Sequence, residues 1–176
     1  MSEASNAFLV VYFSRSGRTR RIAEMLASEL GADVEPICER NSGGAQGRKR
    51  GYVRSLLDAW FERPADLLPA LHDVSRYDVV VVASAVWASH ASAPAVTWLK
   101  EHGGRIPRLA LFCCVRRRGH KQALKQMMHA AGKPAVACCV VTDRDVRTRV
   151  DGVKRQAFAR KIRHQLPDRF EKEGTI

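Results

Sequence analysis

Residues 7–30 read AFLVVYFSRSGRTRRIAEMLASEL, and this stretch is the best guide to the fold of the whole chain. Seven mostly apolar residues, 7–13, are typical of a buried strand, and a hydroxyl-rich turn with one glycine follows them. Ile22, Leu26 and Leu30 then recur at the spacing of one helix face. We therefore predict a strand that leads through a tight turn directly into a helix.

The turn at residues 14–19 has the composition of a phosphate-binding loop. Its hydroxyls and backbone N–H groups gather at the positive end of the helix dipole, which suits a phosphate monoester. The glycine permits a close approach of the backbone, and two arginines add a field that attracts anions. The alternative is an ordinary strand-to-helix turn whose hydroxyls only cap the helix. The predicted phosphate-binding residues are Ser14, Arg15, Ser16, Gly17, Arg18 and Thr19.

Apolar runs alternate with helical patterns along the rest of the chain. Near-continuous valines, as in residues 79–82, are typical of strands that are buried on both faces of a sheet. This alternation favours an α/β fold with a doubly wound parallel sheet and helices on both of its faces. The expected strands are residues 7–13, 33–37, 77–85, 109–115 and 135–142. The expected helices between and after the later strands are residues 92–102, 121–131 and 150–166.

Residues 40–73 interrupt this rhythm, because they are too many for a simple connection between two strands. A glycine-rich, basic loop at 41–51 precedes a helical pattern carried by Val53, Leu56, Trp60 and Phe61. We expect one domain over residues 1–176, with the loop and helix of 40–73 inserted in it as a crossover that covers the sheet. The alternative is that the basic loop closes over a ligand.

The composition of the chain gives no sign of a membrane span, a disulfide framework or a metal site. The chain has 176 residues, 45% of them hydrophobic, and no apolar run long enough for a membrane span. The start is short and polar, so we expect no signal peptide. Five cysteines without a CxxC spacing, and six histidines without ligand spacing, indicate neither a disulfide framework nor a metal site. We expect a cytoplasmic protein.

The net charge of +12 is concentrated in the second half of the chain. Residues 105–172 hold eighteen Lys or Arg against five Asp or Glu. Such a bias gives a solvated basic face and steers acidic partners toward the protein. The basic residues form no recognisable nucleic-acid reading motif, so we do not expect a nucleic-acid partner.

Two segments carry a resemblance to the flavodoxin family. Residues 14–19 match its phosphate loop, Ser/Thr-x-Ser/Thr-Gly-x-Thr, and residues 84–94, SAVWASHASAP, resemble its segment Gly-Ser/Thr-Pro-Val-Trp-Ala-Gly with a following proline. Gly51-Tyr52 and Leu57-Asp58-Ala59 resemble short flavodoxins with an inserted helix before the third strand. The resemblance covers essentially the whole chain. It implies a five-stranded parallel sheet with the order 2-1-3-4-5 and a bound FMN.

The resemblance also implies which residues surround the flavin. An indole such as that of Trp87 stacks well on a flat, apolar ring, although a core or lid position is the alternative. Residues expected to line the ring are Ala85, Val86, Trp87, Ala88 and Ser89. Residues expected to border its pyrimidine edge are Cys114, Val115, Arg116 and Gly119.

The sequence departs from the family at three places. Ala85 stands where the family has proline, and Ser89 stands where it has glycine. The loop after the fourth strand, commonly glycine-rich, contains Arg116, Arg117 and Arg118. Arginines beside the ring would favour its reduced form, whereas arginines that obstruct the site would mean that FMN binding has been lost.

These expectations define one function and two alternatives. The first is an FMN-binding redox protein that moves electrons or hydride through a non-covalently bound flavin to a redox partner or small-molecule acceptor. The second is an NAD(P)H-dependent reductase of a quinone or another acceptor, which the basic charge favours because electron carriers usually present an acidic face. The third is a binding module that kept the fold and lost the flavin. No residue stands out as a catalytic acid, base or nucleophile.

Overall fold

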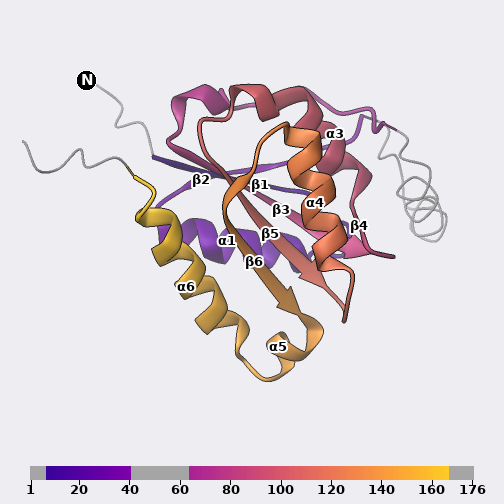
Figure 1. Ribbon diagram of the computed structural model, residues 1–176, viewed down its shortest axis with the longest axis vertical. Coiled ribbons are helices and arrows are strands. Elements are labelled where there is room, and N and C mark those ends of the chain that lie inside the picture. The colour runs from indigo at the N-terminus through magenta and orange to yellow at the C-terminus, as the bar shows by residue number, and fades with distance from the viewer. Residues whose placement is uncertain (1–6, 41–63, 167–176) are drawn as a thin grey trace, which may run out of the picture.

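The structure, a computed structural model, describes residues 7–40 and 64–166 (Figure 1). The strands are β1 (Phe8–Tyr12), β2 (Asp33–Pro36), β3 (Val79–Trp87), β4 (His90–Ala91), β5 (Leu109–Val115) and β6 (Ala135–Thr142). The α-helices are α1 (Arg18–Leu30), α3 (Ala93–His102), α4 (His120–Ala131), α5 (Asp143–Arg147) and α6 (Asp151–Arg163), and two short 3₁₀ helices are η1 (Val74–Arg76) and η2 (Gly103–Arg105).

Five parallel strands form the sheet in the order β2-β1-β3-β5-β6. Because β5 and β6 are the fourth and fifth parallel strands along the chain, this is the predicted order 2-1-3-4-5. The predicted fold class is therefore confirmed. A sixth strand, β4, was not predicted and pairs antiparallel with the end of β3. Its two residues are too few to produce an alternating pattern in the sequence.

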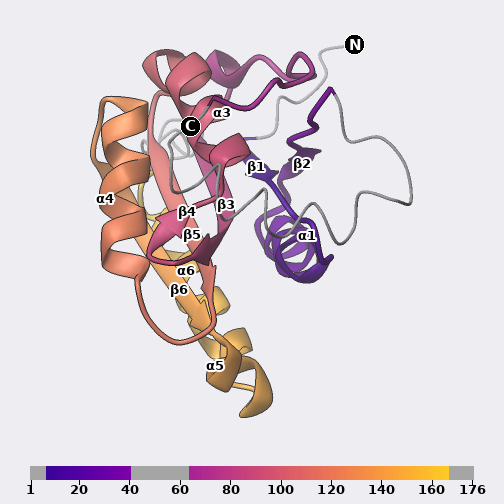
Figure 2. The ribbon, with the colours of Figure 1, turned by 90° about the vertical axis from the view of Figure 1, so that its right-hand side faces the viewer.

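The sheet has a hydrophobic core on each face, as the alternation of side chains along a strand requires. In β1, Leu9 and Val11 face the core beneath α3 and α4, whereas Val10 faces the core beneath α1 and α6. Figure 2 shows α4 and α1 on opposite sides of the sheet. The valines of β3 are fully buried on both faces, which explains their near-continuous run.

The described ends of the 40–73 insertion pair with each other. The Arg40 N–H donates to the Asp66 carbonyl (2.8 Å), and the Leu68 N–H donates to the Cys38 carbonyl (2.8 Å). The insertion therefore leaves and rejoins the sheet beside the end of β2. The helix predicted from Val53 to Phe61 and the family-like residues 51–52 and 57–59 lie outside the described residues.

The chain after β6 differs from the sequence prediction. The final helix is confirmed as α6, but a short helix, α5, comes before it and was not predicted. A capping box starts α5: the Thr142 hydroxyl accepts from the Asp145 N–H, and the Asp145 carboxylate accepts from the Thr142 N–H (2.7 Å). The Lys154 ammonium, from α6, donates to the same carboxylate (2.7 Å).

This network predicts how stability responds to acid. Burial opposes ionisation of Asp145, but the bonds from Lys154 and Thr142 outweigh it and lower its pKa to about 2. A carboxyl with a pKa lower in the folded than in the unfolded chain stabilises the fold above its unfolded value of about 4 and loses this effect toward pH 2. Between about pH 4 and pH 2, the unfolding free energy of the wild type should fall by roughly 1 kcal/mol more than that of Asp145→Asn, as measured by urea unfolding. Asp66→Asn, on an exposed pair with Arg40, is the control. Identical acid branches in the wild type and Asp145→Asn would contradict the expectation.

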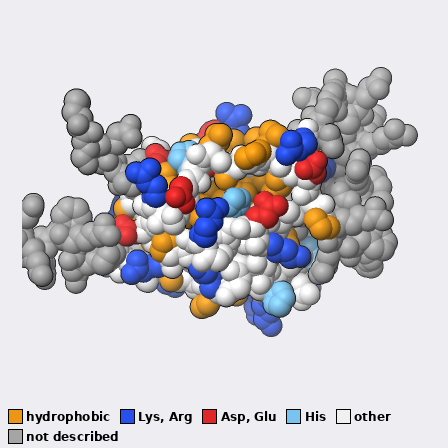
Figure 3. Space-filling view, turned by 90° about the horizontal axis from the view of Figure 1, so that it is seen from above, with side chains coloured by type: hydrophobic (Ala, Val, Ile, Leu, Met, Phe, Trp, Pro, Cys, Tyr) orange, Lys and Arg blue, Asp and Glu red, His pale blue; other side chains and the backbone are white. Residues whose placement is uncertain are grey.

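Surface charges are mixed rather than segregated on the face seen in Figure 3, where basic, acidic and hydrophobic side chains alternate.

All five cysteines are free thiols, and Cys113, Cys114 and Cys139 are buried. In residues 7–40 and 64–166, no group of three or more His, Cys, Asp or Glu side chains is placed to hold a metal ion. No helix in the same residues is both long and apolar enough to cross a membrane.

Candidate functional site

The start of α1 is open to an anion. Gly17 adopts a φ of 82°, and its N–H donates to the Ser14 hydroxyl (3.1 Å), which shapes the turn. The first helical hydrogen bond runs from the Arg21 N–H to the Gly17 carbonyl (3.0 Å), so the N–H groups of residues 18–20 have no acceptor inside the helix. None of the described side chains caps this end, and the first turn contains no acidic residue. The exposed Ser16 hydroxyl lies in the same turn.

Thr19 connects the turn to β5. Thr19 is only 3% exposed, and its side chain lies beside the Cys114 thiol. Burial raises the pKa of Cys114 to about 11, and the neighbouring Thr19 side chain only partly offsets the effect. Cys114 is therefore a neutral thiol that packs beneath the turn. Of the three predicted hydroxyls, that of Ser14 accepts from the Gly17 N–H, that of Ser16 faces solvent, and that of Thr19 is buried against the sheet.

Each arginine of the turn pairs with a carboxylate from another part of the sheet edge. A guanidinium nitrogen of Arg15 lies 3.6 Å from Glu39, which follows β2. The Arg18 guanidinium forms an ion pair with Asp143, the first residue of α5. Arg116, which follows β5, approaches the second oxygen of Asp143 at 3.9 Å. Arg15 is thus paired on the β2 side of the sheet, and Arg18 is paired on the β6 side.

A tight hairpin carries Trp87. It joins β3 to β4, with Trp87 opposite His90, and both of its central residues, Ala88 (φ 47°) and Ser89 (φ 70°), have positive φ. Two-residue hairpins with positive φ at both positions follow the strand twist and usually contain glycine or asparagine. The Trp87 side chain, on the α1 side of β3, is half-buried.

The loop after β5 packs directly on this hairpin. Gly119, with a φ of 98°, lies so close that a Cβ atom there would be 2.6 Å from the Ser89 Cα. The Ser84 hydroxyl accepts from the Ser92 N–H (3.0 Å) and so holds the far end of the hairpin. The second and third predicted segments of the site are therefore neighbours.

The predicted site residues differ in whether their side chains or only their backbone can contact a ligand. The side chains of Val86 and Val115 belong to the core on the α3 and α4 side, which leaves only their backbone for a ligand. Ala85 is half-buried, and Ala88, Ser89 and Arg116 are exposed. In the described part of the chain, Arg117 and Arg118 make no ion pair and extend into solvent.

Sequence reasoning missed Asp143 and gave no role to two histidine nitrogens. Asp143 follows β6 as Arg116 follows β5, and the carboxyl ends of neighbouring parallel strands meet at one edge, so this signal was available. Beside the contact between Ser89 and Gly119, the Nδ1 atoms of His90 and His120 are buried and have no hydrogen-bond partner among the described residues. The burial of these nitrogens depends on tertiary contacts that no local pattern reveals.

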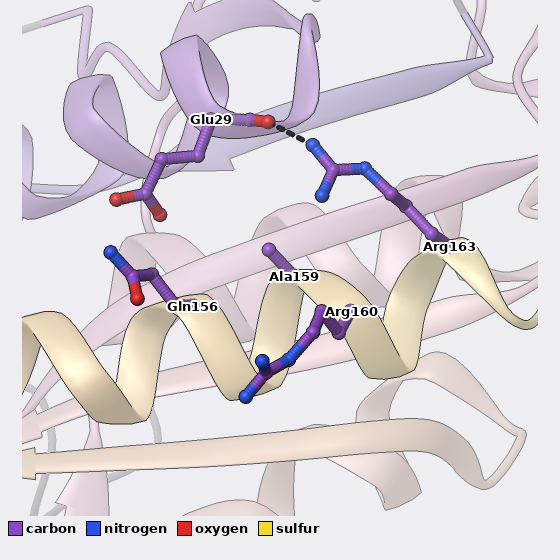
Figure 4. A pocket seen from close by; sticks show the side chains of 5 residues that line it. All are labelled: Glu29, Gln156, Ala159, Arg160 and Arg163. Carbon is purple, nitrogen blue, oxygen red and sulfur yellow. Dashed lines mark hydrogen bonds between the residues drawn. The ribbon is translucent and has the colours of Figure 1, made fainter.

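A surface hollow between α1 and α6 lies away from these loops (Figure 4). The Arg163 guanidinium donates to the Glu29 carbonyl across it. Glu29 lies about 17 Å along the helix axis from Arg18, at about 1.5 Å per residue, so the hollow is at the other end of α1. The lining residues are Glu29, Gln156, Ala159, Arg160 and Arg163.

Comparisons with known proteins match this fold. No protein-family model and no curated protein sequence matches the chain. A flavoprotein from Lactobacillus acidophilus NCFM, crystallised in complex with FMN, is 20% identical, with 81% of this chain and 97% of that chain covered and a TM-score of 0.64. A flavodoxin, WrbA-like protein from Agrobacterium tumefaciens is 14% identical, with 90% and 98% covered and a TM-score of 0.52. The apo form of an NADH:FMN oxidoreductase is 12% identical, with 92% and 91% covered and a TM-score of 0.54.

At identities this low, the similarity concerns the fold rather than the ligand. The strand order of the sheet and the similarity to these solved structures lead to the same fold. The chain therefore has the flavodoxin-like fold that its two sequence motifs predicted.

Proposed function

We propose that this protein binds FMN non-covalently and moves electrons or hydride through it. The observation that carries the proposal is the glycine-led, uncapped start of α1 at the carboxyl edge of the sheet, beside the Trp87 hairpin. In open parallel sheets, ligands bind at this edge where the winding direction reverses, and flavodoxin with FMN is the general example of that rule. Here the reversal falls between β1 and β3.

The chemistry of the turn fits a phosphate monoester. N–H groups without a helical acceptor, the Ser16 hydroxyl and the absence of an acidic residue from the first turn of α1 all favour a dianion there. Gly17 lies in open space, with no atom within 4 Å of the position that a Cβ would take. We assign the phosphate to the Ser14–Thr19 turn, with Arg15 and Arg18 adding positive charge.

The flavin ring is assigned to the space bordered by the hairpin and the β5–α4 loop. In this proposal Trp87 stacks on the ring, and backbone groups of residues 85–89 and 114–119 border it. FMN, when bound, supplies the redox chemistry, and the protein binds it, orients it and tunes its electronics. Arg116 and its two neighbours add positive charge beside the pyrimidine edge, which stabilises negative charge there.

The net charge and the free thiols support a proposal for the partner and the compartment. The net charge of +12 supports an acidic redox partner or acceptor rather than a basic one. It also supports the second candidate, an NAD(P)H-dependent reductase of a quinone or similar acceptor. Five free thiols support a cytoplasmic setting. Turnover of a quinone with NADH or NADPH distinguishes the reductase from a carrier.

The test of the proposal is FMN binding to the purified protein, measured by quenching of flavin fluorescence. We expect Ser16→Ala to weaken FMN binding about tenfold, because a hydrogen bond to a charged group contributes about 1.5 kcal/mol or more. Adding Thr19→Ala should weaken it further, through loss of the buried contact with Cys114.

Ser28→Ala is the matched control, because Ser28 is an exposed serine near the other end of α1. This variant should bind FMN as the wild type does. Unchanged FMN affinity in Ser16→Ala would contradict the phosphate assignment. A wild-type protein that binds no flavin would instead support the module that lost its cofactor.

A further inference from the structure

Asp143 joins two loops of the candidate site. It follows β6 directly, and its two carboxylate oxygens face Arg18 of the phosphate turn and Arg116 of the β5–α4 loop. Arg18 and Asp143 are 125 positions apart in the sequence. In Figure 1, α5, which begins with Asp143, lies at the end of β6 at the bottom of the view. One carboxylate therefore offsets positive charge from two of the loops assigned to the flavin.

The carboxylate is held in place by the structure around it. The capping box of Thr142 and Asp145 fixes the turn that carries Asp143, and Lys154 anchors that turn to α6. The Asp143 side chain is 27% exposed and the Arg18 side chain is 53% exposed. An ion pair this accessible to water is weak, so a stronger anion can exchange with the carboxylate.

Charge decides what this arrangement does to a ligand. A phosphate monoester carries up to two negative charges and needs the positive charge of Arg18, which Asp143 partly neutralises. The carboxylate also repels the incoming phosphate. Without Asp143, Arg18 would be free to turn toward the phosphate, because its side chain is exposed and long.

We propose that Asp143 is an internal counter-ion for Arg18 that competes with the ligand phosphate and thereby sets the affinity of the site. The inference rests on the proposed function only in taking FMN as the ligand. It assigns Asp143 a role that tunes binding and gives it no chemical step. An anion that enters the turn takes over the interaction with Arg18 and leaves Asp143 to Arg116.

The first test compares FMN with riboflavin, which has the same ring and no phosphate. We expect Asp143→Asn to bind FMN roughly fivefold more tightly than the wild type at low salt, with a smaller gain at high salt. Riboflavin affinity should stay the same in both proteins. A general disturbance of the fold would change both ligands together, and thermal unfolding provides a second check on folding.

The second test is a double-mutant cycle with Arg18→Ala. Because the gain comes from release of Arg18, Asp143→Asn should improve FMN binding by less than about twofold in the Arg18→Ala background. Glu24→Gln is the matched control, since Glu24 pairs with Arg20 on the exposed face of the same helix (2.7 Å). It also removes one negative charge, and it should leave FMN affinity within about twofold of the wild type.

The outcomes separate this inference from the proposed function. Weaker or equal FMN binding in Asp143→Asn, or an equal gain with and without Arg18, would overturn the counter-ion role. If no variant binds FMN, titration with inorganic phosphate followed by NMR provides the same comparison. Tighter phosphate binding by Asp143→Asn would then support the inference while the flavin proposal fails, and unchanged phosphate binding would overturn both.

Discussion

We expect Gly119→Ala to lower the free energy of unfolding by about 2–4 kcal/mol and to disturb the Trp87 hairpin. Two costs add at this position. The backbone φ of 98° strains any residue that has a Cβ, and that Cβ would lie 2.6 Å from the Ser89 Cα and 2.7 Å from its hydroxyl oxygen. Because the clash is with backbone, the two loops must move apart. Urea unfolding measures the loss, and Trp87 fluorescence reports on the hairpin.

Gly132→Ala is the matched control for this variant. Gly132 also has a positive φ, 69°, but no atom lies within 4 Å of the position that its Cβ would take. Only backbone strain of roughly 1 kcal/mol applies there. The difference between the two variants therefore isolates the contact between Gly119 and Ser89. Equal losses of stability in both would show that this contact carries no weight.

We expect Glu35→Ala to cost about 2–4 kcal/mol of stability, because it removes a buried carboxylate that accepts hydrogen bonds from two backbone N–H groups and contacts a histidine ring. Glu35 lies in the edge strand β2 and is only 3% exposed. Its carboxylate accepts from the Leu71 N–H (2.8 Å) and the His72 N–H (3.0 Å), and it also contacts the His72 Nδ1 (2.7 Å). This one side chain holds the returning end of the 40–73 insertion on the sheet.

Two measurements show whether the loss is local. Hydrogen exchange at the Leu71 and His72 amides should become faster in Glu35→Ala. Glu24→Ala, which removes an exposed glutamate paired with Arg20, should change stability by no more than about 0.5 kcal/mol. If both glutamate variants lose the same stability, the hydrogen bonds that Glu35 accepts contribute nothing measurable.

The fold was largely predictable because its signals are local. A strand that is buried on both faces must be apolar at every position, so residues 79–82 indicate a central parallel strand before any contact is known. The alternation of such strands with helices, and the glycine at residue 17 before a helix, need only short-range steric rules. The two residues of β4 gave no such signal, and the short helix α5 was not predicted.

The candidate site was predictable as a set of loops and not as a set of contacts. Residues 14–19, 85–89 and 114–119 lie at or just after the carboxyl ends of three strands, and the parallel topology brings those strand ends to one edge. Which side chains pair across that edge is a separate question. Arg18 was expected to serve a phosphate, and the structure also pairs it with Asp143.

The sequence by itself therefore indicated the alternation of buried strands and helices and the three loops at the carboxyl edge of the sheet, and its resemblance to flavodoxins implied the strand order. Only the tertiary structure decided that Cys114 packs under Thr19, that Gly119 meets Ser89, and that Asp143 faces two arginines. The physical reason is the range of the forces involved. Apolar periodicity and backbone sterics involve neighbours in the chain and are therefore visible in the sequence, whereas a hydrogen bond or ion pair acts over a few ångströms between residues that folding has first to bring together.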